Sequence, residues 1–191
     1  MTDSEVDVLV AALSNSTRAQ APAGFPVDAR AAANPGLYSW WGDEEGRRVL
    51  AAALDVDELP PLLYAGQAGA TKWPSGKRSN ATLRSRIGQQ HIRGNARSST
   101  FRLTLSTILL VELGLTPATG GRLTPDSNRV VSDWIAAHLR VAIVPFPDRD
   151  RLGVVEAAVV GRLDPPLNLD HCASSALRAR LTELRRALPR R

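Results

Sequence analysis

The sequence has 191 residues, of which 43% are hydrophobic and 23% are charged, a size that suits one ordinary globular domain better than two. Its longest mostly apolar stretch, residues 103–115, contains Glu112 and is too short to span a bilayer, and the one cysteine, Cys172, excludes an intramolecular disulfide and a zinc site built from cysteines. The first residues are acidic and lack Lys and Arg, unlike a secretory signal, so we expect a cytoplasmic protein that does not contact membranes.

Positive charge is concentrated in one part of the chain. The formal net charge is +5, yet residues 1–60 hold four Arg against ten acids. Residues 61–102 hold eight Lys or Arg and no acid. A solvated basic face would also give this pattern, but an acid-free stretch of such length favours a surface that binds phosphate groups.

The first part of the chain predicts short elements around two strands. Apolar residues 6–13 predict a helix, and residues 14–34, rich in Pro and Ala, indicate a connecting segment. Residues 36–41 and 61–68 are short apolar runs bounded by turn residues, which is typical of strands. The acidic segment between them contains a further helical piece at residues 47–54.

A basic helix follows a loop that is rich in Gly, Ser and Pro, residues 66–80. From Ala81 the pattern becomes helical, because Leu83, Ile87 and His91 recur at intervals that place them on one helix face.

The remaining residues predict helices and a third strand. We expect helices over residues 100–113, 126–138 and 148–161 and a strand at 140–146. The last helix has an apolar stripe, which packs either on its own domain or on a second copy to give a homodimer; the stripe comprises Leu177, Leu181, Leu184 and Leu188. A sheet this small argues against a doubly wound fold and for an α+β sandwich. The expected parts are an N-terminal helix with its connecting segment (1–34), a central domain (35–172) and a C-terminal amphipathic helix (173–191).

Several polar residues have the chemistry that cleavage of nucleic acid requires. Such a site needs a carboxylate for a divalent cation, cations around the scissile phosphate, and a base near an attacking water. The candidates are Tyr38, Tyr64, Arg84, Arg86, His91 and Glu156. Glu156 lies within the apolar run VVEAAVV, where a carboxylate is costly to desolvate unless it is paired or bound to a cation. On helix geometry alone, it could equally face solvent.

Two triplets, Gly36-Leu37-Tyr38 and Tyr64-Ala65-Gly66, resemble the paired signature of the GIY-YIG nuclease family. The resemblance continues with L-R-S-R-I at residues 83–87, then Glu156, and then Asn168 within P-L-N-L-D. Small stand-alone bacterial members are the most similar. The resemblance implies a small three-stranded, mainly antiparallel sheet flanked by helices, with extra helices at both ends of the chain.

The resemblance also implies roles for named residues. Tyr38 would act as general base or orient the attacking water, and its ordinary pKa of about 10 calls for a nearby cation or a hydrogen-bond relay. Arg86 would bind the scissile phosphate, since its planar donors suit bidentate contact. Glu156 would ligate one Mg²⁺ or Mn²⁺ per active site. Tyr64 would help to arrange water and phosphate, and Asn168 would brace the site.

The sequence departs from the family pattern at two positions. Gln67 stands where several relatives have lysine, so that cationic role is either missing or taken by Lys72 or Lys77. His91 lies five residues after Arg86, one residue later than relatives place a histidine or tyrosine. His91 is therefore either a catalytic or phosphate-contacting residue or a hydrogen-bonded histidine at the edge of the core.

The basic stretch provides the expected nucleic-acid contacts. These candidates are Lys72, Lys77, Arg78, Arg84, Arg93, Arg97 and Arg102. Trp73, among them, either stacks on a base or has a structural role. We expect a metal-dependent endonuclease that hydrolyses phosphodiester bonds by in-line attack of water at a single-metal site, with double-stranded DNA as its partner. Two alternatives stay open: a binding module of the same fold with weak or no catalysis, and a nuclease that cleaves RNA.

Overall fold

The fold is organised around a three-stranded antiparallel sheet, in a computed structural model that describes residues 2–188. Strand β1 (Gly36–Gly42) is central and pairs with β2 (Leu62–Ala68) on one side and β5 (Leu139–Pro145) on the other. The α+β fold predicted from the sequence is confirmed, and each predicted strand agrees with the observed one to within one residue.

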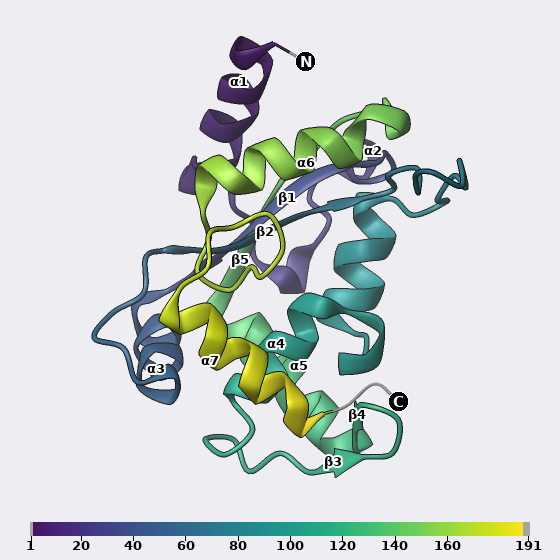
Figure 1. Cartoon of the computed structure of the whole chain (residues 1–191). Coiled ribbons are helices and arrows are strands. Elements are labelled where there is room, and N and C mark those ends of the chain that lie inside the picture. Colours follow the sequence, from purple (N-terminus) through teal and green to yellow (C-terminus); the bar gives the residue numbers. More distant parts are fainter. Residues whose placement is uncertain (1, 189–191) are drawn as a thin grey trace.

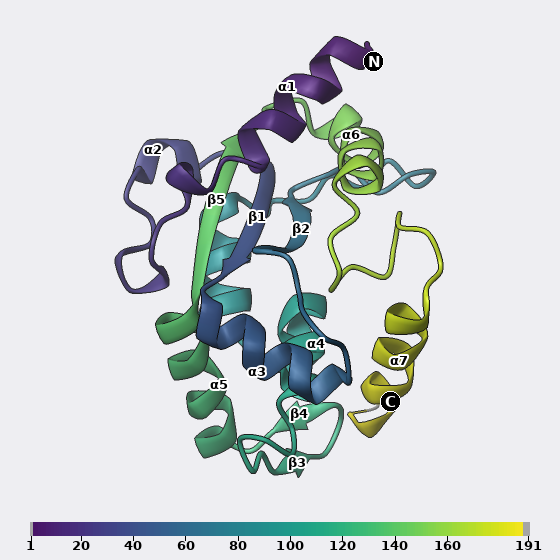
Figure 2. The ribbon, with the colours of Figure 1, turned by 90° about the vertical axis from the view of Figure 1, so that its left-hand side faces the viewer.

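Helices cover both faces of this sheet (Figures 1 and 2). Helices α1 (Asp3–Leu13) and α6 (Arg149–Leu163) lie together on one side and share a small apolar cluster with Leu37. Tyr38 and Trp40 point to the opposite side, into the larger core. This alternation along β1 follows from the pleat, which turns successive side chains to opposite faces.

The larger core lies under the remaining helices. These are α3 (Glu44–Leu54), the π-helix η3 (Arg84–Ile92), α4 (Thr100–Ile108), α5 (Pro125–His138) and α7 (Ala176–Leu184). Among the described residues, short elements connect these helices or precede the sheet: α2 (Ala29–Ala32), 3₁₀ turns (Ser16–Arg18, Pro22–Gly24, Ala96–Ser98, Arg185–Ala187) and the strand pair β3 (Pro117–Ala118) and β4 (Arg122–Leu123).

One predicted helix is shorter than expected, and one strand pair was not predicted. The helix expected over residues 100–113 ends at Ile108 and continues as turns to Gly114, whose φ of 56° suits glycine. The β3–β4 pair that follows was not predicted, because strands of two residues leave no periodic signal.

The apolar stripe of the C-terminal helix packs on its own domain. Leu181 and Leu188 are buried in the larger core, and Leu177 and Leu184 pack against it. Figure 2 shows α7 beside α4. Of the two alternatives for this stripe, packing within the chain is the one observed, so the stripe is not free to bind a second copy.

None of the helices within residues 2–188 has the length and apolar character needed to cross a membrane.

Candidate active site

Two tyrosines from neighbouring strands approach each other on one face of the sheet. Tyr38 of β1 and Tyr64 of β2 have ring centroids 6.5 Å apart, and Tyr38 pairs in register with Gly66. A Cβ atom at Gly66 would lie 2.8 Å from the Tyr38 hydroxyl oxygen and 3.2 Å from Cε1 of Tyr64. Glycine suits this position, because a side chain would collide with the Tyr38 hydroxyl and crowd the Tyr64 ring.

The Tyr38 hydroxyl begins a buried chain of hydrogen bonds. Its oxygen lies 2.8 Å from Nε2 of His91, and Nδ1 of His91 lies 2.7 Å from Oγ of Ser99. Ser99 also caps α4, since its Oγ accepts the backbone N–H of Arg102 at 3.0 Å. Tyr38, His91 and Ser99 are all buried. His91 thus lies at the edge of the core and, at the same time, in direct contact with the candidate catalytic tyrosine.

The π-helix explains the unusual spacing of His91. Residues 84–92 form a helix whose hydrogen bonds span five residues, such as that from the Arg93 N–H to the Gly88 carbonyl. A π-turn holds roughly one residue more than an α-turn, so the fifth residue after Arg86 lies nearer to one full turn beyond it. The extra residue in the sequence is absorbed by the wider turn, and His91 reaches Tyr38.

Arg102 supports this arrangement from inside the protein. Its side chain is 0% exposed and donates hydrogen bonds to the carbonyls of His91 and Ile92 and to side chains of Asn128 and Ser132. Burial lowers its pKa to about 10. The prediction that Arg102 binds nucleic acid is wrong, because a guanidinium enclosed in this way cannot reach a phosphate; it joins η3 to α4 and α5 instead.

Arg86 has a half-buried guanidinium with spare donor capacity. One terminal nitrogen donates to Oε1 of Gln90 at 2.6 Å, whereas Nε is buried and has no acceptor within residues 2–188. Its positive charge shifts the pKa values of Tyr38, Tyr64 and Glu156, so it lies close to all three. A buried donor without an acceptor costs about 1–3 kcal/mol, which favours the arrival of an anion at this place.

Glu156 joins the same cluster from α6. Burial raises the pKa of its carboxyl group to about 7, and this effect outweighs the opposing effects of the Arg86 cation and of a hydrogen bond from the Gln67 backbone. The negative charge of Asp170 raises it further. The side chain is half-buried, so Glu156 does not face open solvent, which had remained an alternative.

The free edge of β2 positions the last candidate. The Asn168 side chain accepts the N–H of Ala65 at 3.0 Å and donates to its carbonyl at 2.8 Å, as a neighbouring strand would. The same edge provides the Gln67 N–H that binds the Glu156 carboxylate. Asn168 therefore braces the strand that carries Tyr64 and covers an edge that would otherwise be unpaired.

Tyr38 and His91 are both uncharged at neutral pH, because their surroundings shift their pKa values. Burial raises the pKa of Tyr38 well above its ordinary value, with a further rise from Tyr64. Burial, and then the Arg86 and Arg102 cations, lower the pKa of His91 well below its ordinary value. At neutral pH the site therefore holds a phenol hydrogen-bonded to a neutral imidazole.

Comparison with known families agrees with this geometry. The family model of the GIY-YIG catalytic domain matches residues 36–187. The chain belongs to the GIY-YIG family. Comparison with curated proteins gave no match, and neither did comparison with solved structures. The family consists of endonucleases, so the fold described above is of the nuclease type.

The glycines of both GIY-YIG triplets have a steric reason. Besides the contacts of Gly66, a Cβ at Gly36 would lie 2.3 Å from the carbonyl oxygen of Val144 on β5. The first glycine thus allows β1 and β5 to pair, and the second allows the two tyrosines to meet. Ser99, Gln90 and Asp170 were not identified as site residues from the sequence, since only folding brings them to the signature residues.

The donors of this GIY-YIG site suit a hard divalent cation. Residues 2–188 contain no group of three or more His, Cys, Asp or Glu that could enclose a metal ion. Glu156 supplies one carboxylate, and Asp170 is close enough to raise its pKa. Mg²⁺ keeps several waters and takes one or two protein carboxylates, so the residues present fit it.

Apart from Arg102, the cations predicted to contact nucleic acid lie at the surface, and the contact itself stays a prediction. Lys72, Lys77, Arg78, Arg84, Arg93 and Arg97 are all exposed. The side chain of Gln67 accepts the N–H of Ala70 at 2.9 Å and so shapes the turn after β2.

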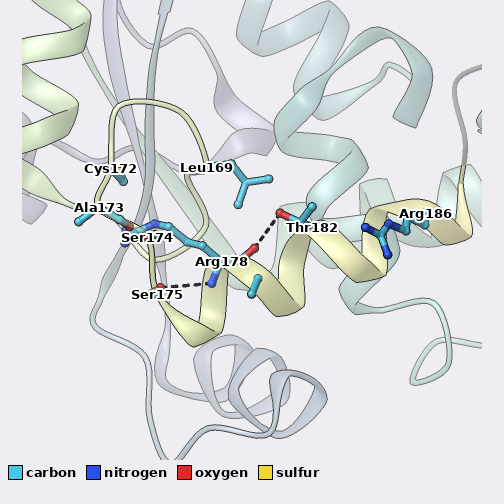
Figure 3. A pocket seen from close by; sticks show the side chains of 9 residues that line it. Leu169, Cys172, Ala173, Ser174, Ser175, Arg178, Thr182 and Arg186 are labelled. Atoms are coloured by element: carbon cyan, nitrogen blue, oxygen red, sulfur yellow. Dashed lines mark hydrogen bonds between the residues drawn. The ribbon is translucent and has the colours of Figure 1, made fainter.

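A hollow of about 470 Å³ beside α7 has a structural role (Figure 3). Arg178 lines it, and its guanidinium is occupied by hydrogen bonds to backbone carbonyls, among them that of Asn168 at 3.0 Å, and to the Asp164 carboxylate at 2.8 Å. Burial raises the pKa of the nearby Cys172 thiol to about 11, which leaves it unreactive at neutral pH. Arg178, which lines the hollow, therefore fixes the loop that carries Asn168.

Proposed function

We propose that this GIY-YIG domain is a metal-dependent endonuclease that hydrolyses phosphodiester bonds in DNA by in-line attack of water. The observation that carries the proposal is the convergence of the Tyr38–His91 hydrogen bond, the Arg86 guanidinium and the Glu156 carboxylate in one place. A proton acceptor, a phosphate-binding cation and a cation ligand are the three components that such a reaction needs.

Tyr38 and His91 would move the proton of the attacking water. As the water oxygen bonds to phosphorus, its proton passes to the Tyr38 oxygen while the phenolic proton passes to Nε2 of His91. A free phenolate, which the raised pKa of Tyr38 disfavours, is then never required. This path needs the His91 tautomer in which Nδ1–H donates to Ser99 Oγ.

Arg86 would bind the scissile phosphate. The phosphate gains negative charge as water attacks, and guanidinium donors stabilise that charge most strongly in a partly desolvated site. An anion bound there would also satisfy a guanidinium that has an unused Nε donor.

Glu156 would hold the divalent cation, with Asp170 adding negative potential. A bound Mg²⁺ or Mn²⁺ supplies neutralising charge for the phosphate and the leaving oxygen. Because burial raises the pKa of Glu156 to about 7, a proton competes with the cation near neutral pH, and cation affinity should rise with pH through that range.

One experiment distinguishes the proposed DNA nuclease from two alternatives, an RNA nuclease and a binding module without catalysis. Purified protein would be incubated with supercoiled plasmid, single-stranded DNA and structured RNA, each with Mg²⁺, Mn²⁺ or EDTA. Metal-dependent cleavage of DNA supports the proposal; preferential cleavage of RNA, or binding without cleavage in every cation, contradicts it. Glu156→Gln should abolish cleavage, while the exposed Glu112→Gln, as a matched control, should cleave like the parent.

A further inference from the structure

A hairpin of residues 69–80 projects from the fold between β2 and η3 (Figure 1). Its two arms are joined by the Lys72 N–H, which donates to the Lys77 carbonyl at 2.9 Å. Trp73 follows Lys72 and has 63% of its surface exposed, whereas Trp40 and Trp134 are buried. A large aromatic side chain left in solvent at the end of a hairpin lacks the packing role that usually explains tryptophan.

The base of the 69–80 hairpin is fixed rather than loose. Arg149, the first residue of α6, donates from one nitrogen to three carbonyls at 2.7–2.9 Å, those of Gly69, Ser79 and Ala81. The Thr71 N–H also donates to the Arg149 carbonyl at 2.9 Å. Both arms are therefore held by the start of the helix that carries Glu156.

Asp150 holds the hairpin further out. Its carboxylate accepts the Thr71 hydroxyl at 2.6 Å and pairs with Arg78 at 3.4 Å, and its carbonyl accepts the Trp73 indole N–H at 3.2 Å. One edge of the indole is thus oriented, while most of the ring stays in solvent. Such an orientation limits the entropy that Trp73 would lose on stacking.

The same contacts link Trp73 to the start of α6, the helix that carries Glu156. Asp150 precedes Glu156 by six residues of α6, a rise of about 9 Å. A base step in a DNA strand rises about 3.4 Å, so this axial rise alone equals roughly three base steps. Lys72 and Lys77 are exposed beside Trp73, within a stretch of the chain that contains no acid. Cations that flank an exposed aromatic ring match a nucleotide, whose phosphate and base they contact separately.

We propose that the 69–80 hairpin binds DNA beside the cleaved bond, with Trp73 stacked on a base a few nucleotides from the scissile phosphate and Lys72 and Lys77 on the backbone. This inference rests on the proposed nuclease function. Stacking requires a base with a free face, so the preferred substrate carries an unpaired base near the cut.

The test measures binding apart from cleavage. In the Glu156→Gln background, fluorescence anisotropy would compare a paired duplex with duplexes that carry one unpaired base at successive positions. Trp73→Ala should weaken binding of the best of these about five- to a hundredfold and paired duplex far less, and Trp73→Phe should keep most of the affinity. Val111→Ala, which removes another exposed apolar side chain, should change nothing. The double variant Lys72→Gln/Lys77→Gln should reduce the salt dependence of log K by a slope of roughly 2.

The outcomes separate this inference from the proposed function. Equal affinity of Trp73→Ala and its background for every DNA overturns the hairpin's role, even if the parent cleaves DNA. If Trp73→Ala weakens the binding of paired duplex and of DNA with an unpaired base equally, Trp73 does not stack on an unpaired base. A parent protein that cleaves nothing but needs Trp73 for unpaired-base binding supports the hairpin and contradicts the nuclease proposal. A circular dichroism melt of Trp73→Ala that matches the parent ensures that lost binding is not lost folding.

Discussion

Tyr38 and His91 are joined by a hydrogen bond of 2.8 Å between the phenolic oxygen and Nε2, although 53 residues separate them in the chain. The first tyrosine of the signature therefore has a partner inside the protein before any substrate binds. Both groups are buried and neutral at rest. A proton passed along the bond leaves an imidazolium on His91, whose charge the negative charge gained by the attacked phosphate would balance.

Tyr38→Phe tests this proton path. The ring and its packing stay, but the relay is broken, and we expect kcat to fall about a hundred- to ten-thousandfold. His91 Nε2 loses its partner, which should lower the free energy of unfolding by about 1–3 kcal/mol. Single-turnover cleavage and urea unfolding measure the two effects. Full activity in a folded Tyr38→Phe variant would contradict the role of the phenol.

Ser99→Ala tests whether the hydrogen bond between Ser99 Oγ and His91 Nδ1 orients the imidazole. The change removes both the partner of His91 Nδ1 and the cap of α4, so stability should fall by about 1–2 kcal/mol. Ser99→Thr keeps the hydroxyl and should restore most of the activity. Comparing kcat as a function of pH for both variants separates orientation from stability. If both variants are equally slow and have the pH profile of the parent, Ser99 does not position His91.

Glu156→Gln should stabilise the protein at high pH and not at low pH. The folded-state pKa of about 7 exceeds the ordinary value of 4.5, so ionisation disfavours the folded state. Below pH 4.5 both states are protonated and the variant gains nothing; as pH rises through 7 the parent loses stability that the variant keeps. At pH 8 the unfolding free energy of the variant should exceed that of the parent by roughly 1–3 kcal/mol. This is less than the whole pKa shift would give, because the Glu156 side chain retains some solvent contact. Thermal melts at pH 4 and 8 without metal measure it, and an equal gain at both values would refute the buried-carboxylate explanation.

Gly66→Ala should damage the site through sterics alone. The added methyl group would lie 2.8 Å from the Tyr38 oxygen, so the phenols must separate, at a cost of about 1–3 kcal/mol and with most of the activity lost. Gly24→Ala is the control, because its Cβ would have no atom within 4 Å. Urea unfolding and cleavage assays of both variants give the comparison. Parent-like cleavage by Gly66→Ala would show that the close approach is not needed.

Arg102→Met should unfold more easily while any folded fraction binds nucleic acid like the parent. The variant removes the guanidinium donors to the His91 carbonyl and to Asn128, while the Ile92 carbonyl keeps the Ser132 hydroxyl, so we expect a loss of about 2–4 kcal/mol in unfolding free energy. The exposed Arg84→Met should show the reverse, with unchanged stability and weaker binding. Urea unfolding and DNA affinity below the transition measure both. A marked loss of affinity in folded Arg102→Met would restore its predicted role at the surface.

The strands and the signature residues followed from the sequence because their signals are local. Residues 36–41 and 61–68 are apolar runs bounded by turn residues, and that pattern alone fixes the strands on which Tyr38 and Tyr64 lie. The order of triplets, basic helix, Glu156 and Asn168 needed no contact information either.

Tertiary structure decided which groups touch and which charges are buried. Asn168 meets Ala65 across 103 residues, and the wider turn of η3 brings His91 to Tyr38; neither follows from local periodicity. Arg102 looks like its exposed neighbours in the sequence, yet it is enclosed, because carbonyls from one helix and side chains from another satisfy its donors. A cation can be buried only where such acceptors converge, and their convergence depends on how distant segments pack.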